Sequence, residues 1–382
     1  MSQRPHKPIP LSAPDLDETD RDAVLEVLQG RHLSRGPFIE AFERRVAETA
    51  GRQEGVAVSS GTAALHLAAI LSGLKPGDEV LTTPFSFIAS ANIILYLGAT
   101  PVFVEIDPET LNMDVDALES RITPRTRAIV AVHAFGRPHK IGRLEASARR
   151  HDLILIEDAC EAIGGECDGR PLGGFGDFSS FAFYPNKQVT CGEGGVLLTD
   201  HGSAARRARG LRNQGRDPDG PGYLELGFNY RMTDFQAALA TSQLQRLPSI
   251  LERRRQIADG YRRRLEHLNE WVLPVGDPGS SWFVYVVRLH DDLPLNSRDA
   301  ILSGLTDRGI GCGRYFEPIH LQPFYRQQFG FSEGDFPITE RIAARTIALP
   351  FFNRITEEQL DRVAEALAEL TPRLSDLPGG TA

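Results

Sequence analysis

Apolar runs and helical stretches alternate along the first two-thirds of the chain. Short apolar runs that predict buried strands lie at 55–58, 79–83, 100–106, 128–132 and 153–156. The intervening sequence predicts helices, at about 62–74 and at about 139–151. Continuous apolar runs that alternate with helices are typical of a mainly parallel sheet covered on both faces. A sheet of this kind binds ligands at the carboxyl ends of its strands.

The pattern changes after residue 230. A Thr-x-x-Gln sequence at Thr233 predicts a helix that ends near Leu247, and Pro248 separates it from an arginine-rich helix. The remaining elements that we expect are strands at 282–287 and 311–315 and helices that begin near Ser297 and after Thr356. The sequence therefore predicts a large α/β domain at 1–247 and a smaller C-terminal α+β domain at 248–382. The N-terminal segment is a candidate to pack on the small domain.

Composition and charge exclude several classes of protein. Hydrophobic residues make up 41% and charged residues 24% of the 382 residues, which are values typical of a globular protein. The 42 basic and 51 acidic residues give a net charge of −9, which argues against nucleic acid or an anionic membrane as the main partner. No apolar run approaches the roughly 18 residues of a membrane span, and the first residues do not resemble a signal peptide. We therefore expect a cytoplasmic protein.

Cysteine and lysine usage narrows the candidate chemistry. The four cysteines show no CxxC pair and no histidine at zinc-finger spacing, so we expect neither a metal site nor a disulfide framework. Only four of the 42 basic residues are lysines, which are Lys7, Lys75, Lys140 and Lys187. A lysine retained in such a chain is a candidate for a reaction that arginine does not perform, because guanidinium stays protonated and forms no covalent bond with a carbonyl.

Three segments carry candidate chemistry. Ser59–Ala63 lies between a predicted strand and a predicted helix, where free amides and hydroxyls bind an anion or simply cap the helix. Asp158 directly follows an apolar strand, and a buried carboxylate there needs a cation or strong donor, such as a protonated ring nitrogen. A helix cap or a structural ion pair explains Asp158 equally well. Lys187 lies among the aromatic residues and glycines of 173–195, which favours a shielded nucleophile over a surface lysine.

Six motifs carry a resemblance to a known family. They are Leu33–Pro37, Ser60–Leu65, Glu157–Ala162, Phe183–Lys187 with Gly192–Gly195, Asn229–Asp234 and Ile319–Pro323. In this order, from about residue 9 to residue 368, they resemble the DegT/StrS family of pyridoxal-phosphate-dependent nucleotide-sugar aminotransferases. The resemblance implies an aspartate-aminotransferase-like large domain (PLP fold type I), pyridoxal 5'-phosphate as cofactor and a homodimer with shared active sites.

The resemblance also implies a role for particular residues. Lys187 would bind the cofactor aldehyde covalently, Asp158 would pair with the ring nitrogen, Phe87 would stack on the ring, and Glu161 would lie near the ring hydroxyl. The phosphate would be bound by Gly61, Thr62 and Ala63, together with Asn229 of the partner subunit. Tyr315 and His320 fall near the expected sugar-nucleotide cleft. One departure is that Ala182 stands where many relatives have a phosphate-binding serine, for which Ser179 or Ser180 is a candidate substitute.

The reaction implied by the resemblance is transfer of an amino group to a nucleotide-linked keto-sugar, with glutamate as the expected donor. The stretch 186–195 is more similar to members that act on 4-keto sugars than to those that act on 3-keto sugars. A dehydratase of the same family is an alternative, but those relatives carry histidine at the lysine position. A non-catalytic cofactor-binding regulator is a second alternative, and a nicotinamide enzyme is disfavoured because no GxGxxG follows a predicted strand.

Overall fold

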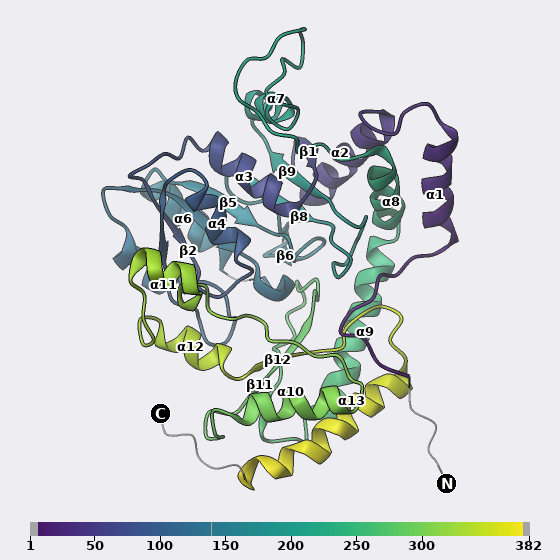
Figure 1. Ribbon diagram of the computed structural model, residues 1–382, viewed down its shortest axis with the longest axis vertical. Coiled ribbons are helices and arrows are strands. Elements are labelled where there is room, and N and C mark those ends of the chain that lie inside the picture. The colour runs from purple at the N-terminus through teal and green to yellow at the C-terminus, as the bar shows by residue number, and fades with distance from the viewer. Residues whose placement is uncertain (1–6, 139, 377–382) are drawn as a thin grey trace.

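A seven-stranded sheet forms the centre of the large domain (Figure 1). The computed structural model describes residues 7–138 and 140–376. The strands are β1 (Glu54–Val58), β2 (Glu79–Thr82), β3 (Thr100–Phe103), β4 (Thr126–Val132), β5 (Ile154–Asp158), β8 (Phe178–Ala182) and β9 (Gly195–Thr199). Their order is β1-β9-β8-β5-β4-β2-β3. Strand β9 runs opposite to the other six strands, which all point in the same direction. The expected α/β fold with a mainly parallel sheet is therefore confirmed.

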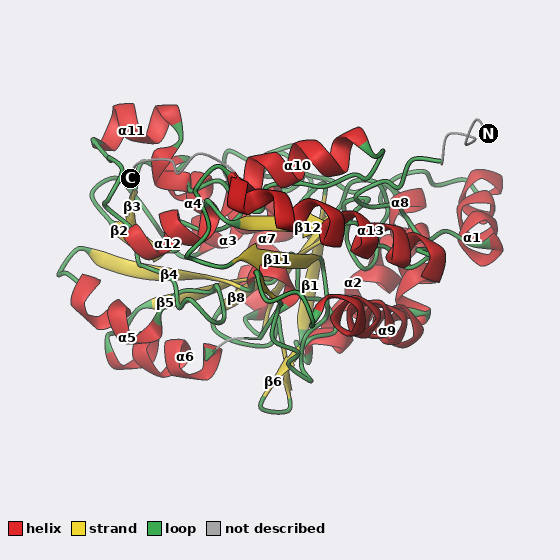
Figure 2. Cartoon of the chain, turned by 90° about the horizontal axis from the view of Figure 1, so that it is seen from below, coloured by secondary structure: helices red, strands yellow, loops and turns green. Residues whose placement is uncertain are grey.

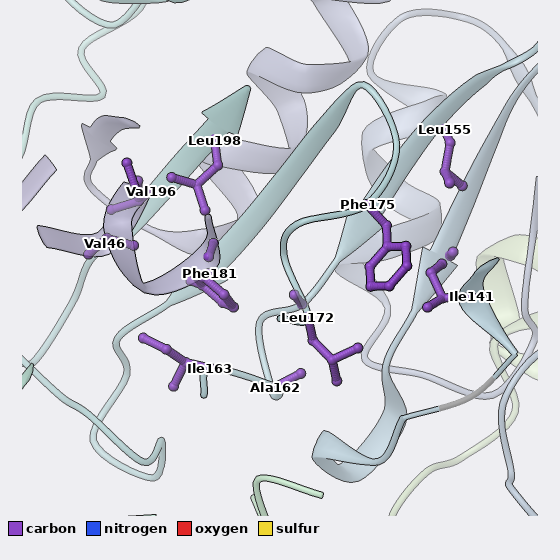
Figure 3. Close-up of a cluster of buried hydrophobic side chains, with 14 of the residues drawn as sticks. Val46, Ile141, Leu155, Ala162, Ile163, Leu172, Phe175, Phe181, Val196 and Leu198 are labelled. Carbon is purple, nitrogen blue, oxygen red and sulfur yellow. The ribbon is translucent and has the colours of Figure 1, made fainter. Parts of the chain in front are cut away.

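Helices cover both faces of this sheet (Figure 2). One face is covered by α2 (Pro37–Ala50), α5 (Val115–Leu118), α6 (Ile141–Arg150) and α8 (Asp234–Gln245). The other is covered by α3 (Gly61–Leu71), α4 (Ala89–Leu95) and α7 (Gly202–Leu211). Side chains alternate along each strand, so that Ala57 and Val56 belong to opposite cores. Figure 3 shows the first core, where Phe175, Phe181 and Leu172 pack together. Continuous apolar strands are explained by this double coverage.

The small domain contains a three-stranded antiparallel sheet of β10 (Trp271–Val272), β11 (Tyr285–Leu289) and β12 (Thr346–Leu349). Its helices are α10 (Ser297–Asp307) and α13 (Glu357–Leu370). The strand expected at 282–287 begins only at Tyr285, because Trp282 has a φ of 51° and its carbonyl accepts a hydrogen bond from Arg254. The strand expected at 311–315 is wrong: a single bridge joins Gly313 to Ala348.

Helix α9 (Leu247–Leu265) joins the two domains, and it contributes side chains to both cores. Leu247 packs in the first core of the large domain, whereas Ile257 and Tyr261 belong to the core of the small domain. Ile9, near the start of the described chain, lies in the same small-domain core and bridges Ile310. A division at 247/248 remains a prediction, since α9 runs continuously across it.

The remaining elements lie around these two sheets. They are α1 (Glu18–Gln29), α11 (Pro323–Phe329), α12 (Pro337–Ala343) and the hairpin strands β6 (Glu166–Cys167) and β7 (Arg170–Pro171). The hairpin projects from the large domain at the bottom of Figure 2. Among the described helices, none combines the length and the apolar composition that crossing a membrane requires.

Candidate active site

A cavity of about 620 Å³ opens where β4, β5 and β8 end. Val132, Asp158 and Ala182, the last residues of these three strands, line it. The other lining residues come from the start of α3, from α4 and the loop before it, from the loops after β5 and β8, and from the small domain. They are Ser60, Gly61, Thr62, Leu65, Phe87, Ala89, Ser90, Cys160, Glu161, Tyr184, Asn186, Lys187, Glu193, Gly194, Phe283, Arg314, Tyr315 and Phe316. The cavity therefore lies at the carboxyl edge of the sheet, as the fold class predicts.

Asp158 places a buried carboxylate in this cavity, and no side-chain cation within the described residues forms an ion pair with it. It is 6% exposed; Ser90 donates a 2.6 Å hydrogen bond to Oδ2, and the Cys160 amide donates one of 3.2 Å to Oδ1. Both donors are neutral groups. A buried carboxylate with neutral donors favours a cationic partner, which a protonated ring nitrogen supplies. The arrangement fits the role that the resemblance assigns to Asp158.

Lys187 lies in the same cavity, in a turn in which its amide donates to the Tyr184 carbonyl at 2.9 Å. Its side chain is 12% exposed, and Nζ lies 3.5 Å from Glu161 Oε1 and 3.9 Å from the centre of the Phe283 ring. Glu161 accepts a 2.8 Å hydrogen bond from the Phe135 amide, and burial raises the pKa of its carboxyl despite the nearby lysine. Lys187 is thus a largely buried amine beside a buried carboxyl group.

The amino end of α3 forms one wall of the cavity. Gly61 and Thr62 line it, while the Ala63 amide donates to Ser60 Oγ at 3.1 Å. A Cβ on Gly61 would lie 2.7 Å from Ala182 Cβ, so this helix end packs directly on the end of β8. The first amides of a helix have no acceptor within the helix, and they attract an anion such as a phosphate. Ala63 itself is not among the lining residues.

Neither serine of β8 takes the place of the missing phosphate ligand. Ser180 Oγ lies 3.4 Å from both Cys160 Sγ and the Gly61 carbonyl oxygen, beneath the helix end. Ser179 Oγ donates to the Gly173 carbonyl. Neither side chain lines the cavity: the two serines point to opposite faces of β8, and helices cover both faces of the sheet. The idea that Ser179 or Ser180 substitutes for the serine is therefore not supported.

The structure separates the expected sugar-binding residues. Tyr315 lines the cavity, and burial, followed by the charge of Glu161, raises its pKa. His320 does not line it: this side chain is fully buried beside Phe336, with Nε2 2.9 Å from Glu340 Oε1. The ring packs and hydrogen-bonds between η3 (Ile319–Leu321) and α12. This placement does not favour direct contact with a substrate in the cavity, and the role of His320 in substrate binding stays a prediction.

The two remaining residues implied by the resemblance lie at the surface. Phe87 lines the cavity and is 63% exposed, so its ring is accessible. Asn229 is exposed and lies outside the cavity of its own subunit. Sequence reasoning missed Ser90, Phe283 and Arg314. Each comes from an element whose approach to the cavity depends on tertiary packing, and no local pattern marks it.

Comparisons with known proteins agree with this geometry. A model of the DegT/DnrJ/EryC1/StrS aminotransferase family matches residues 14–368. The chain belongs to this family. GDP-perosamine synthase of Caulobacter vibrioides is 39% identical over 97% of this chain and 100% of its own length. The spore coat polysaccharide biosynthesis protein SpsC of Bacillus subtilis is 36% identical over 97% and 99%.

Solved structures support the same assignment. The putative sugar aminotransferase Spr1654 from Streptococcus pneumoniae, in its PMP form, superposes with a TM-score of 0.91 at 27% identity, covering 96% of this chain and 100% of that chain. It has also been solved in a PLP form. This DegT/DnrJ/EryC1/StrS family member is a pyridoxal-phosphate-dependent sugar aminotransferase, and the expected fold and cofactor are confirmed.

The residues of the cavity fit pyridoxal phosphate. Lys187 supplies the amine, Asp158 the buried carboxylate, the start of α3 the anion site and Phe87 an aromatic face. When bound, the cofactor acts as an electron sink that carries the amino group between substrates. The individual contacts of these residues with the cofactor stay predictions.

We predict that His320→Ala lowers stability without changing substrate affinity. The substitution removes the side-chain partner of Glu340, which keeps its hydrogen bonds from the Gly334 and Phe336 amides. It also leaves a void beside Phe331 and Phe336, and we expect a total cost of about 2 kcal/mol of unfolding free energy. Denaturant unfolding measures the loss, and steady-state kinetics give KM for the sugar substrate. A raised KM at unchanged stability would instead place His320 in substrate binding.

Proposed function

We propose that the enzyme transfers an amino group from glutamate to a keto-sugar linked to a nucleoside diphosphate, at a 4-keto carbon. The observation that carries this proposal is the placement of Lys187 Nζ, Asp158 and Glu161 in one cavity. Similarity to a protein named GDP-perosamine synthase supports a nucleotide-linked sugar. The stretch Asn186–Gly195 is more similar to family members that act on 4-keto sugars than to those that act on 3-keto sugars, and this similarity supports the 4-keto position.

Lys187 has two tasks in this proposal. It holds the cofactor between turnovers, and its free amine then moves a proton between the reacting carbons. Glu161 lies 3.5 Å from Nζ and is held by a hydrogen bond from the Phe135 amide. In this proposal its carboxyl group orients the amine and balances the positive charge of the protonated amine. Phe283 covers the other side of the amine and excludes water. A dehydratase is the second candidate function, and the presence of Lys187 rather than histidine disfavours it.

In this proposal the amino donor and the sugar bind at the solvent-exposed side of the cavity. Arg314 lines this side and is 47% exposed, with Asp299 at 3.0 Å and Glu317 at 3.3 Å. An exposed guanidinium that is paired only with two exposed carboxylates can exchange them for the carboxylate of an amino acid such as glutamate or the phosphates of a nucleotide. This supports two anionic substrates that use the same site in turn.

The test of the proposed function is a substrate panel. Purified enzyme with pyridoxal phosphate is incubated with 4-keto and 3-keto sugars linked to nucleoside diphosphates, using 15N-glutamate as donor. Mass spectrometry is expected to show a 15N-labelled amino-sugar from a 4-keto substrate. Amination of a 3-keto sugar alone would contradict the position, and loss of a hydroxyl without nitrogen gain would identify the dehydratase.

We also propose a homodimer in which Asn229 completes the site of the partner subunit. Asn229 is exposed, and the loop that follows α7 projects from the top of the molecule in Figure 1. This loop exposes Tyr223, Leu224 and Leu226, of which Leu226 is 90% exposed. Apolar side chains in such a position favour burial against another chain, and Phe87 in the cavity lining is similarly exposed. A second copy of this chain covers both surfaces in this proposal. Cytoplasmic location stays a prediction.

Mixing two inactive variants is expected to restore activity. Asn229→Asp places a negative charge beside the phosphate of the partner's site, and Lys187→Ala removes the amine. In a mixed dimer, one site carries both defects and the other carries neither, so up to half of the normal activity per mixed dimer should return. Native mass spectrometry measures the fraction of mixed dimers. Exchange without recovery would show that Asn229 acts within its own subunit or at no site.

A further inference from the structure

A second cavity, of about 290 Å³, lies between the two domains. The large domain contributes Leu111, Phe135 and Arg137, and the small domain contributes Trp282, Val284 and Arg288. It shares no lining residue with the candidate active site. Apart from two arginines, Glu109 and Thr346, its walls are formed by apolar or aromatic side chains.

Arg137 is a buried cation without a partner in this cavity. Four arginines of the described chain are more than nine-tenths buried. Three of them donate to carbonyl groups: Arg52 to Gly173, Arg254 to Trp282 and Arg345 to Leu293. The guanidinium of Arg137, only 7% exposed as a residue, forms no hydrogen bond or ion pair with any described residue. Burial lowers its pKa, which reflects the cost of holding this charge away from water.

The nearest carboxylates do not close an ion pair with Arg137. Asp277 and Asp107 lie close enough to oppose the effect of burial on its pKa, but each is held by backbone amides. Asp277 accepts a 2.9 Å hydrogen bond from Gly279, and Asp107 accepts one of 2.8 Å from Glu109. They moderate the positive charge and leave the five N–H donors of the guanidinium available.

Arg288 offers a second guanidinium to the same space. Its side chain is half-buried and likewise forms no hydrogen bond or ion pair within 7–138 and 140–376. The neighbouring carboxylate, Asp291, is paired with Arg345 at 3.3 Å and with Arg341 at 3.6 Å. The lining residues carry two arginines and one carboxylate, that of Glu109, and the excess positive charge is moderated further by Asp107 and Asp277 near Arg137.

We propose that this cavity binds a small organic molecule that carries one carboxylate on an apolar body. Guanidinium groups remain charged in proteins and bind carboxylates through two parallel hydrogen bonds. Because Glu109, Asp107 and Asp277 limit the positive charge of the site, a monoanion fits it better than a phosphate dianion. The volume holds about ten water molecules at ~30 Å³ each, which is enough for an aromatic or short aliphatic acid. The proposal does not depend on the sugar or donor proposed above.

Benzoate is a suitable probe, with benzyl alcohol as its neutral analogue. The chain has two tryptophans, and Trp282 lines the cavity whereas Trp271 is hydrogen-bonded to Thr371 in the small domain. Titration of the holoenzyme with benzoate at constant ionic strength is expected to give a saturable change in tryptophan fluorescence. Arg137→Gln and Arg288→Gln should each raise the apparent Kd at least about tenfold. Arg255→Gln, an exposed arginine on α9, is the matched control and should not change it.

Several outcomes would overturn the proposal. These are no response of the wild-type protein to benzoate, an equal response to benzyl alcohol, or an unchanged Kd in Arg137→Gln. Loss of the response in Arg314→Gln but not in Arg137→Gln would place the probe in the active-site cavity instead.

Thermal stability provides an independent readout that does not need the probe. If the charge of Arg137 is uncompensated in the free protein, Arg137→Met should leave Tm unchanged or raise it, because the charge is removed and the side-chain volume is retained. A clear fall in Tm would show that Asp107 and Asp277 already hold Arg137 as a structural cation, and the proposal would fail.

Discussion

Lys187→Arg is expected to give a folded protein that stays colourless with pyridoxal phosphate and transfers no amino group. Arginine keeps the positive charge near Glu161 and Phe283, but its guanidinium forms no covalent bond with an aldehyde. It also fails to deliver the proton that the free amine moves during the reaction. We expect activity to fall by at least about 10³-fold, within the range of proton-transfer catalysis, together with the visible absorption band. Absorption spectra and the rate with glutamate measure both losses.

Lys75→Arg is the matched control, because Lys75 is exposed in the turn before β2. This variant should remain yellow and active. Borohydride reduction of the wild-type holoenzyme, followed by peptide mapping, should label Lys187. A label on Lys75 or Lys140, or full colour in Lys187→Arg, would refute the assignment of the cofactor-binding amine.

Much of the fold follows from local pattern. The apolar runs at 128–132 and 153–156 correspond to β4 and β5, because strands covered on both faces must be apolar throughout. The Thr-x-x-Gln sequences at Thr233 and Thr356 mark the starts of α8 and α13, since in each the glutamine side chain accepts a hydrogen bond from the threonine amide. The bounds of β8 and the presence of β9 could not be predicted, because serines, glycines and aromatic residues lie in and around these strands and blur the apolar pattern, and sheet pairing defines them.

The candidate site was predictable where residue type and strand position coincide. Asp158 and Lys187 are unusual in their surroundings, and the structure brings both into one cavity. His320 shows the limit of a motif, because its position in the sequence does not reveal that its ring faces Glu340 instead of the cavity. Ser90 and Phe283 could not be found from the sequence. Their roles depend on the packing of α4 and the small domain against the ends of the central strands.

Asp158→Asn is expected to leave the fold intact and reduce the half-reaction with glutamate by about 10²-fold or more. The isosteric amide retains an oxygen to accept hydrogen bonds from Ser90 or Cys160, so packing at the end of β5 should change little. It lacks the negative charge that stabilises a protonated ring nitrogen, and lost electrostatic stabilisation of this kind costs about 3 kcal/mol of activation free energy. Stopped-flow spectroscopy of the holoenzyme with glutamate measures the rate.

Ser90→Ala separates the charge of Asp158 from its orientation. The serine donates the 2.6 Å hydrogen bond to Oδ2, so its removal leaves the carboxylate charged but less firmly held. We expect a rate loss of about tenfold, which corresponds to one hydrogen bond to a charged group. A larger rate loss in Asp158→Asn than in Ser90→Ala would therefore show that the charge of Asp158 matters more than its orientation. If Asp158→Asn kept near-normal turnover, or if Ser90→Ala were the more severe change, the charge of Asp158 would not be what supports the reaction, and a structural role beneath α3 would explain its burial.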